Sequence, residues 1–488
     1  MCAWWEKLFK HKPWGKRTAE AASEGESPRP RSGLKVRRIT LGLDFGTAAT
    51  KCCFREQGDE RPFFIVGYQP PTCHASRILV PSAASWRDGK LFFGFRAEEV
   101  GASRGIRSFK MCLLCQAKAE SRPATHVPGT DGCPNCLTDR PGYFQIGAHQ
   151  LSAEDVASLY LAVVLREAKQ RVHDVLGHSA HEVRLSVNSA APLDQMGEFG
   201  HVGDHFERVL YYAWQLANRA QNPWQLEDAL ADLEQARSEP RPAPEMSPTR
   251  VFPETHAAMT AYLLLPQTEK GLYASIDIGA GTTDVAFFWL QKDEQETKAW
   301  YYAAGSKRIG MDDVDRALGP LLRAEGGNLR AAREAQNLHP YQGHIEPIAR
   351  RIYQHQASVL HDAMKVDQRP GAWFKDGVAR YRLFLVGGGS MCGPVTEPLR
   401  RAPPRHGTRW EEEPCLLSIP AATKVALPGG EVVSLGTLNE PAAERLCLLA
   451  YGLAHPRPDI PRYERDREGV RVETKVREPP PEHTGHWW

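Results

Sequence analysis

Residues 275–288 read SIDIGAGTTDVAFF, an apolar strand followed by a glycine-rich turn and a second apolar strand. Residues 41–54 read LGLDFGTAATKCCF and follow the same plan. When DIGAGTT (277–283) is set beside DFGTAAT (44–50), the aspartate, the first glycine and the last threonine coincide, 233 residues apart. Two long segments that contain the same acidic hairpin predict two similar lobes that face a shared cleft.

The residue types in these hairpins suit a phosphate site. Glycine lets backbone N–H groups approach a phosphate closely, and threonine hydroxyls add further donors. An aspartate at a strand end offers a hard oxygen to Mg²⁺, usually through water. A third glycine cluster, LFLVGGGS (383–390), also follows an apolar strand, but neither a Walker A loop nor a GxGxxG turn occurs in the right context. The sequence therefore predicts a different solution to phosphate binding.

Composition places the chain among soluble globular proteins. Its 488 residues predict two to four domains, and 42% hydrophobic with 25% charged residues exclude wholesale disorder. A net charge of +2 argues against a polybasic nucleic-acid binder. Apolar runs fall well short of the roughly 18 residues that span a bilayer, and the N-terminus has no secretory signal pattern. We therefore expect a cytoplasmic protein without a transmembrane segment.

Strand-like and helix-like segments alternate along the chain, which predicts an α/β fold. Ser152 followed by Asp155 predicts a helix N-cap ahead of an amphipathic segment. The expected elements are strands at 39–45, 51–54 and 182–188, helices at 152–176 and 204–236, and an exposed loop at 237–250.

LGLDFGTAAT, ASIDIGAGTTD and LFLVGGGS resemble the phosphate-1, phosphate-2 and adenosine motifs of the actin-like ATPase superfamily, and in particular the nucleotide-binding domain of heat-shock-70 (DnaK-type) chaperones. Further segments resemble that family in the same order: ILVPS (78–82), SFK (108–110), PETHAA (253–258), GMDDVD (310–315) and AYGLA (450–454). The resemblance covers about residues 37–456. It implies an actin-like (ribonuclease-H-like) fold with two lobes around a nucleotide cleft.

The resemblance also implies roles for individual residues. Asp44 and Asp277 would hold Mg²⁺ through water, supported by Asp284. Lys110 would stabilise charge on the transferring phosphoryl group, and Glu254 or Asp277 would orient the attacking water. Nucleotide contacts are implied for Gly46, Thr47, Ala48, Gly279, Gly281, Thr282, Thr283, Gly310, Gly387, Gly388 and Gly389.

Plainer explanations stay open for two of these residues. Glu254 is also explained as a helix cap, and Lys110 as a solvated surface charge. The chain departs from the family pattern at Asn188, where a proline is expected, and at Ala280, Met391 and Leu446, where a glycine, an arginine and an acid are expected. These departures keep open a scaffold that senses ATP without hydrolysing it.

Four cysteines form the pattern Cys112-x2-Cys115-x17-Cys133-x2-Cys136. Paired CxxC turns at this spacing predict a closed, structural Zn²⁺ site. A redox pair or incidental thiols are the alternatives. Because Cys112 closely follows Lys110, we expect a knuckle here to stiffen the segment that presents the lysine or to display a docking surface.

The expected organisation is a flexible N-terminal arm (1–35), lobe I (36–270) with a zinc-knuckle insertion (108–140) and a helical insertion (195–250), lobe II (271–440), a closing helix (441–456) and a C-terminal tail (457–488). The expected function is a heat-shock-70-like slow ATPase without a peptide-binding domain. It would use ATP/ADP, Mg²⁺ and Zn²⁺, and its lobe rotation would regulate a protein partner bound through the zinc knuckle or the N-terminal arm. A filament-forming ATPase, a metabolite kinase and a non-hydrolysing ATP sensor are the alternatives.

Overall fold

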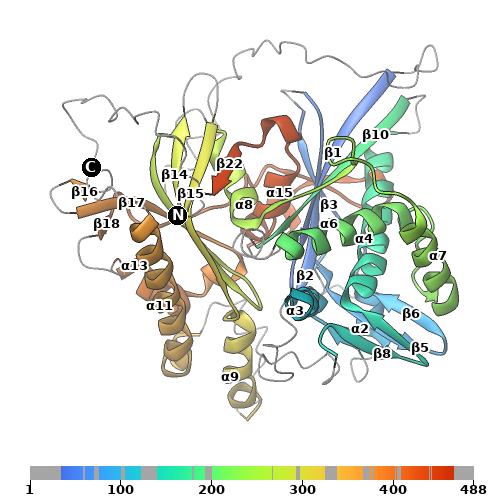
Figure 1. Cartoon of the computed structure of the whole chain (residues 1–488), viewed down its shortest axis with the longest axis horizontal. Helices are drawn as coiled ribbons and strands as arrows, with labels where there is room; N and C mark the ends of the chain where they lie inside the picture. Colours follow the sequence, from blue (N-terminus) through green and yellow to red (C-terminus); the bar gives the residue numbers. More distant parts are fainter. Residues whose placement is uncertain are drawn as a thin grey trace.

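The computed structural model describes residues 35–465 except 59–60, 71–75, 101–104, 122–139, 178–180, 193–199, 266–267, 293–296, 325–337, 367–373, 376–377, 402, 404–407, 439 and 441. Two mixed sheets, each flanked by helices, form two lobes (Figure 1). This arrangement confirms the predicted α/β architecture.

β1 (Lys35–Phe45) lies in the interior of the first sheet, and its apolar residues alternate along the strand, so that they share one face. Leu41 and Leu43 are fully buried there. β1 pairs with β2 in an antiparallel hairpin and with β10 in parallel. The strand order is β12 (Thr249–Pro253), β10 (His181–Ala191), β1 (Lys35–Phe45), β2 (Ala49–Glu56), β3 (Phe63–Val66), β20 (Lys424–Ala426) and β21 (Val432–Ser434), and β4 (Val80–Pro81) pairs with β2.

Helix α4 (Ala153–Leu176) is the longest element of the first lobe. Its predicted cap is confirmed: Ser152 Oγ accepts from the Asp155 N–H at 3.1 Å, and the Ser152 N–H donates to Asp155 Oδ2 at 2.9 Å. α4 packs against α6 (Gly200–Leu216) and α3 (Phe109–Ser121). Smaller elements complete this lobe: β5 (Ala83–Arg87), β6 (Lys90–Phe93), α2 (Phe95–Val100), β7 (Ile106–Arg107), β8 (Tyr143–Ile146), β9 (His149–Ser152), β11 (Trp224–Gln225) and α7 (Leu226–Ser238).

The helical structure predicted over 204–236 is confirmed for most of that range, but it is interrupted near the middle. The chain forms α6, a turn and a short strand, and only then α7. Pro223 lies within this interruption, where its missing N–H and its ring oppose a continuous helix.

The second sheet repeats the hairpin plan. Its order is β16 (Phe374–Lys375), β17 (Val378–Val386), β13 (Gly271–Ile278), β14 (Thr283–Lys292), β15 (Thr297–Lys307) and β22 (Arg462–Arg465), and β17 also pairs with β18 (Thr408–Trp410) and β19 (Cys415–Leu416). Helices α9 (Met311–Ala324), α11 (Gln342–Val366) and α13 (Gly393–Arg401) accompany this sheet, and α11 packs on β14 and β15 (Figure 1).

Short helices join the lobes. α8 (Glu254–Leu263) contacts β10 and β13, and α14 (Ala443–Leu446) leads into α15 (Leu448–Leu453). α15 packs directly on the backbone of β1: a Cβ added to Gly42 would lie 2.1 Å from the Ala450 carbonyl oxygen. Glycine is therefore required for this close approach.

Asn188, at the position where a proline was expected, ties β10 to the end of α15. Its Nδ2 donates to the Leu453 carbonyl at 2.9 Å and to the His455 carbonyl at 3.2 Å. Arg457 Nε donates to its Oδ1 at 3.1 Å. The amide therefore forms contacts between the first sheet and the closing helix that a proline could not form.

Two expected boundaries differ from the structure. β20 pairs with β3, so residues 424–434 belong to the first sheet rather than to the second lobe. β22 pairs in parallel with β15, so residues 462–465 belong to the second sheet rather than to a tail. Both differences come from long-range strand pairing, which local sequence pattern does not specify.

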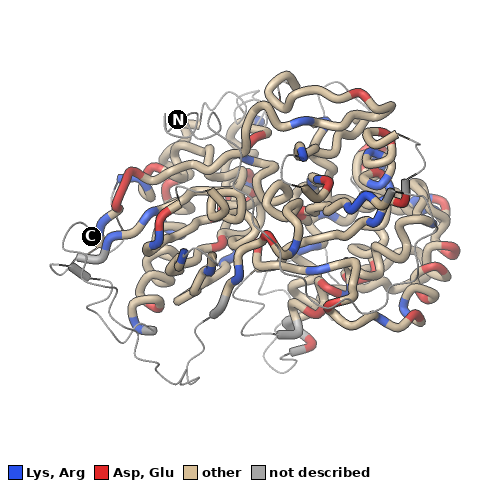
Figure 2. The backbone as a smooth tube through the Cα atoms, turned by 90° about the horizontal axis from the view of Figure 1, so that it is seen from above, with Lys and Arg blue, Asp and Glu red and all other residues tan. Residues whose placement is uncertain are grey.

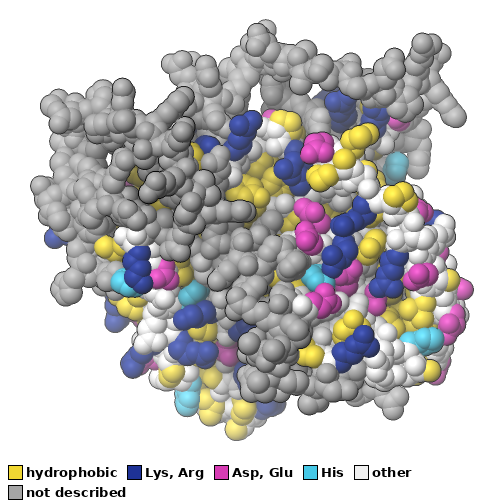
Figure 3. All heavy atoms as spheres, viewed as in Figure 1, with side chains coloured by type: hydrophobic (Ala, Val, Ile, Leu, Met, Phe, Trp, Pro, Cys, Tyr) yellow, Lys and Arg dark blue, Asp and Glu magenta, His cyan; other side chains and the backbone are white. Residues whose placement is uncertain are grey.

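Charge is mixed over the molecule. Lys/Arg and Asp/Glu positions are interspersed along the described backbone (Figure 2), and blue and magenta side chains lie side by side on the face in Figure 3. Within the described residues, no helix has the length and apolarity needed to cross a membrane.

Candidate functional site

The β1–β2 and β13–β14 hairpins have the same register at their turns. Asp44 lies opposite Lys51 in the first hairpin, and Asp277 lies opposite Asp284 in the second. The turns meet between the lobes: a Cβ added to Gly281 would lie 3.0 Å from Thr47 Cγ2. The internal repeat predicted from the sequence thus places two acidic strand ends at one junction.

Carboxylates gather at this junction. Asp44 and Asp284 are buried, at 7% and 6% exposure, and Asp277 is partly buried. Burial raises the pKa of Asp277 to about 7, and the charges of Glu254 and Asp44 contribute in the same direction. Two aspartates directly opposite each other on paired strands also repel, which costs stability. Negative charge concentrated in this way is a common property of a cation-dependent site.

Lys110 and Glu254 form a buried ion pair beside the carboxylates. Lys110 is the second residue of α3 and Glu254 the first residue of α8, and each side chain is 8% exposed. Burial by itself lowers the pKa of Lys110, but the charges of Glu254 and Asp44 outweigh it, so the net shift is upward. Lys110 is therefore charged and buried, which excludes its reading as a solvated surface lysine.

Glycines around the site permit close backbone approach. Gly387 has φ +78°, and a Cβ there would lie 2.1 Å from Asp277 Oδ1. A Cβ on Gly310 would lie 2.2 Å from the Ala280 carbonyl oxygen. Larger residues would push the Gly387 loop away from the carboxylate and the Gly310 segment away from the second turn.

Several predicted nucleotide contacts have partners within the protein. Thr283 Oγ1 is buried and donates to the Ile309 carbonyl at 2.7 Å. The Gly279 N–H donates to the Thr282 carbonyl at 2.8 Å, which closes the turn. Gly389 is buried, and a Cβ there would lie 2.4 Å from Ile278 Cγ2. These residues shape the loops. Gly46, Ala48, Gly281, Thr282 and Gly388 lie at partly or fully exposed positions, whereas the side chain of Thr47 is buried.

Lys51 is a site residue that the sequence reasoning missed. Its Nζ donates to Asp44 Oδ2 at 2.9 Å, and the two side chains are 14% and 10% exposed. A Cβ on Gly46 would lie 3.2 Å from this ammonium group. The signal was available in the repeat, because Lys51 and Asp284 occupy the same place relative to Asp44 and Asp277.

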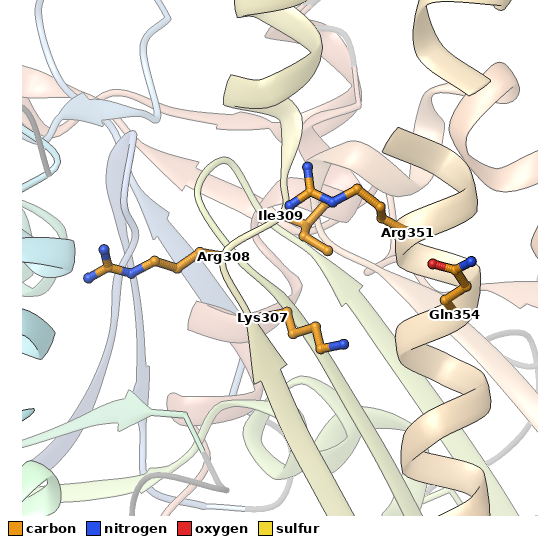
Figure 4. Close-up of a pocket in the computed structure, with 5 residues that line it drawn as sticks. All are labelled: Lys307, Arg308, Ile309, Arg351 and Gln354. Carbon is orange, nitrogen blue, oxygen red and sulfur yellow. The ribbon is translucent and has the colours of Figure 1, made fainter. Parts of the chain in front are cut away.

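A basic cavity of about 300 Å³ lies at the edge of the second lobe. Lys307, Arg308 and Ile309 line it from the end of β15, and Arg351 and Gln354 line it from α11 (Figure 4). Arg308 points away from α11. None of the predicted catalytic residues lines this cavity, so the site is defined by the hairpins and not by it.

The described cysteines do not form the expected knuckle turn. Cys112 and Cys115 both lie buried within α3, and Arg308 Nη2 donates to Cys115 Sγ at 2.7 Å. Cys133 and Cys136 lie outside the described residues. In the part of the chain that the structure describes, no three His, Cys, Asp or Glu side chains converge to hold a metal.

The chain has detectable relatives. It is similar to the chaperone protein HscA homolog of Bordetella petrii, with 26% identity over 426 residues, 78% of this chain and 57% of that protein. Similar matches occur to the HscA homologs of Cupriavidus necator (26%, 61% of this chain, 39% of that protein) and Burkholderia pseudomallei (27%, 64% and 41%). The chain thus spans about half the length of these relatives, and no family model matches it. The resemblance inferred from the motifs is confirmed as distant homology.

Proposed function

Because the chain is a distant homologue of the heat-shock-70-family chaperones, we propose that it binds Mg-ATP between its two lobes and hydrolyses it slowly to ADP and phosphate. One observation carries the proposal. The two hairpins converge, and four carboxylates and two lysines lie around their turns. So many charged groups in one place contribute little to the stability of the fold but suit the binding of a charged ligand.

The donor set fits Mg²⁺. Asp44, Asp277 and Asp284 provide hard oxygens. Burial raises the pKa of Asp277 most, and the negative charges of Glu254 and Asp44, which a divalent cation would neutralise, raise it further. When bound, Mg²⁺ would offset charge on the phosphates. Asp277 and its neighbours would hold its water ligands.

The protein's own groups have distinct tasks in this proposal. Lys110 brings a fixed positive charge to the transferring phosphoryl group, and its ion pair with Glu254 holds the ammonium in place. Glu254 or Asp277 orients the attacking water. The backbone at Gly46 and Gly281, where the turns approach each other, offers N–H donors to phosphate oxygens.

Lobe movement would transmit the nucleotide state to a protein partner. Support comes from contacts that cross the junction close to the turns, namely Thr47 with Gly281 and Arg308 with Cys115. A ligand that separates or tightens the turns changes these contacts, so the two lobes respond to it together. A cytoplasmic location is part of this proposal.

A structural zinc ion is the second part of the proposal. It rests on the spacing of the four cysteines. Cys115 sits on the helix that carries Lys110, so zinc would brace the segment that presents this lysine.

ATP binding and single-turnover hydrolysis with Mg²⁺ test the function, using wild type, Asp277→Asn and the exposed control Asp362→Asn. We expect wild type and the control to hydrolyse ATP, and Asp277→Asn to lose at least 10-fold in rate. Binding without hydrolysis in wild type would instead support a nucleotide-sensing scaffold. Absence of binding would refute the proposal.

A further inference from the structure

The two hairpins are alike in backbone but opposite in charge at one position. Across from the strand-end aspartate, the second hairpin has Asp284 and the first has Lys51. Since the register is the same, Lys51 stands in the first lobe where a carboxylate stands in the second. Neither the positive charge of Lys51 nor the negative charge of Asp284 is needed to form the hairpin.

Lys51 is held at the phosphate-binding turn. Its ammonium contacts Asp44 Oδ2 at 2.9 Å and lies 3.2 Å from the place of a Gly46 Cβ. The side chain is 14% exposed, so the charge is neither free in solvent nor fully enclosed. The positive charge of Lys51 also acts on the second lobe, where it lowers the pKa of Asp277 and so offsets part of the upward shift.

Lys51 differs from Lys110 in the partner that holds it. Lys110 is paired with Glu254. Lys51 is paired with Asp44, one of the proposed Mg²⁺ residues. A cation that attracts Asp44 therefore weakens the hold on Lys51, and the flexible lysine stem lets the ammonium turn to a new anion.

We propose that Lys51 is a second phosphate-binding residue, which exchanges Asp44 for a nucleotide phosphate oxygen when the nucleotide binds. The inference rests on the proposed nucleotide-binding function and deepens it. Two consequences follow: Lys51 selects ligands that carry a β-phosphate over adenosine, and it supports nucleotide binding when Mg²⁺ is absent.

The test compares the affinities of ATP, ADP and adenosine for wild type, Lys51→Met and Lys90→Met, in Mg²⁺ and in EDTA. Lys90 is an exposed lysine on β6 and serves as the matched control. Loss of a charged hydrogen bond predicts that Lys51→Met weakens ADP and ATP binding about 10-fold or more, with a larger effect in EDTA and no change for adenosine. Equal ADP affinity for wild type and Lys51→Met in both buffers would overturn the inference while leaving the proposed function intact.

Asp44→Asn gives a second measurement, in which the affinity for ADP is expected to change in the opposite direction. Without the competing carboxylate, Lys51 is released, so in EDTA this variant should bind ADP more tightly than wild type. The double variant Asp44→Asn/Lys51→Met should lose that gain. A gain that persists in the double variant would overturn the inference, even if Lys51→Met alone folds poorly. Failure of wild type to bind any of the nucleotides would overturn the proposed function and this inference together.

Discussion

Replacing Asp277 with asparagine should stabilise the ligand-free chain at neutral and alkaline pH. Burial of the carboxylate, which lies against Gly387, disfavours its ionised form most, and the charges of Glu254 and Asp44 add to this effect. The rise in its pKa from 3.8 to about 7 corresponds to at most about 4 kcal/mol of penalty on ionisation. Asp277 is partly exposed, so solvent reduces this penalty, and we expect about 1–2 kcal/mol.

The sign of the pH dependence follows from proton linkage. Between pH of about 4 and 7 the folded chain keeps a proton on Asp277 that the unfolded chain has lost. The stabilising effect of that proton is complete at pH values below both pKa values and is lost as pH rises through 7. The advantage of asparagine over aspartate should therefore be clearly smaller at pH 5 than at pH 8.

Urea unfolding in EDTA without nucleotide measures this difference, at pH 5 and pH 8. Asp362→Asn, an exposed change on α11, is the control and should alter the free energy of unfolding by less than about 0.5 kcal/mol at either pH. An Asp277→Asn variant that is less stable than wild type at pH 8, or that shows the same difference at both pH values, would refute the electrostatic reasoning.

The remaining predictions concern three other features of the chain. Lys110→Met leaves the Glu254 charge buried and unpaired, so urea unfolding should show a loss of about 3–5 kcal/mol, most of which Glu254→Gln in the same chain should restore; an equal loss in the double variant would contradict this. Gly387 and Gly429 have φ values of +78° and +82°, but only Gly387 has neighbours within 4 Å of an added Cβ. Alanine at Gly429 should cost about 1–2 kcal/mol of strain, and alanine at Gly387 clearly more; equal shifts in Tm would exclude a steric role for Gly387. Metal analysis should find one zinc per chain, lost in Cys112→Ser; a wild-type chain without zinc would refute the zinc proposal.

The local sequence pattern was sufficient to predict the two hairpins and helix α4. Asp44 and Asp277 occur in segments whose apolar alternation and glycine turns have few other interpretations, and the box formed by Ser152 and Asp155 is a contact between residues three apart. Such features depend on neighbours along the chain, so the amino-acid sequence itself determines them. The repeat also predicted two lobes, and in the structure the second hairpin lies in a sheet of its own.

Tertiary structure decided which charges meet. Lys110 and Glu254 are 144 residues apart, and only the packing of α3 and α8 makes them a buried pair. The role of Lys51 depends on strand register, which sets it opposite Asp44. The pairing of β20 with β3 and of β22 with β15 likewise follows from which sheet edges lie within reach after folding. Burial and electrostatic coupling are properties of three-dimensional neighbourhoods, and no local pattern of residues encodes them.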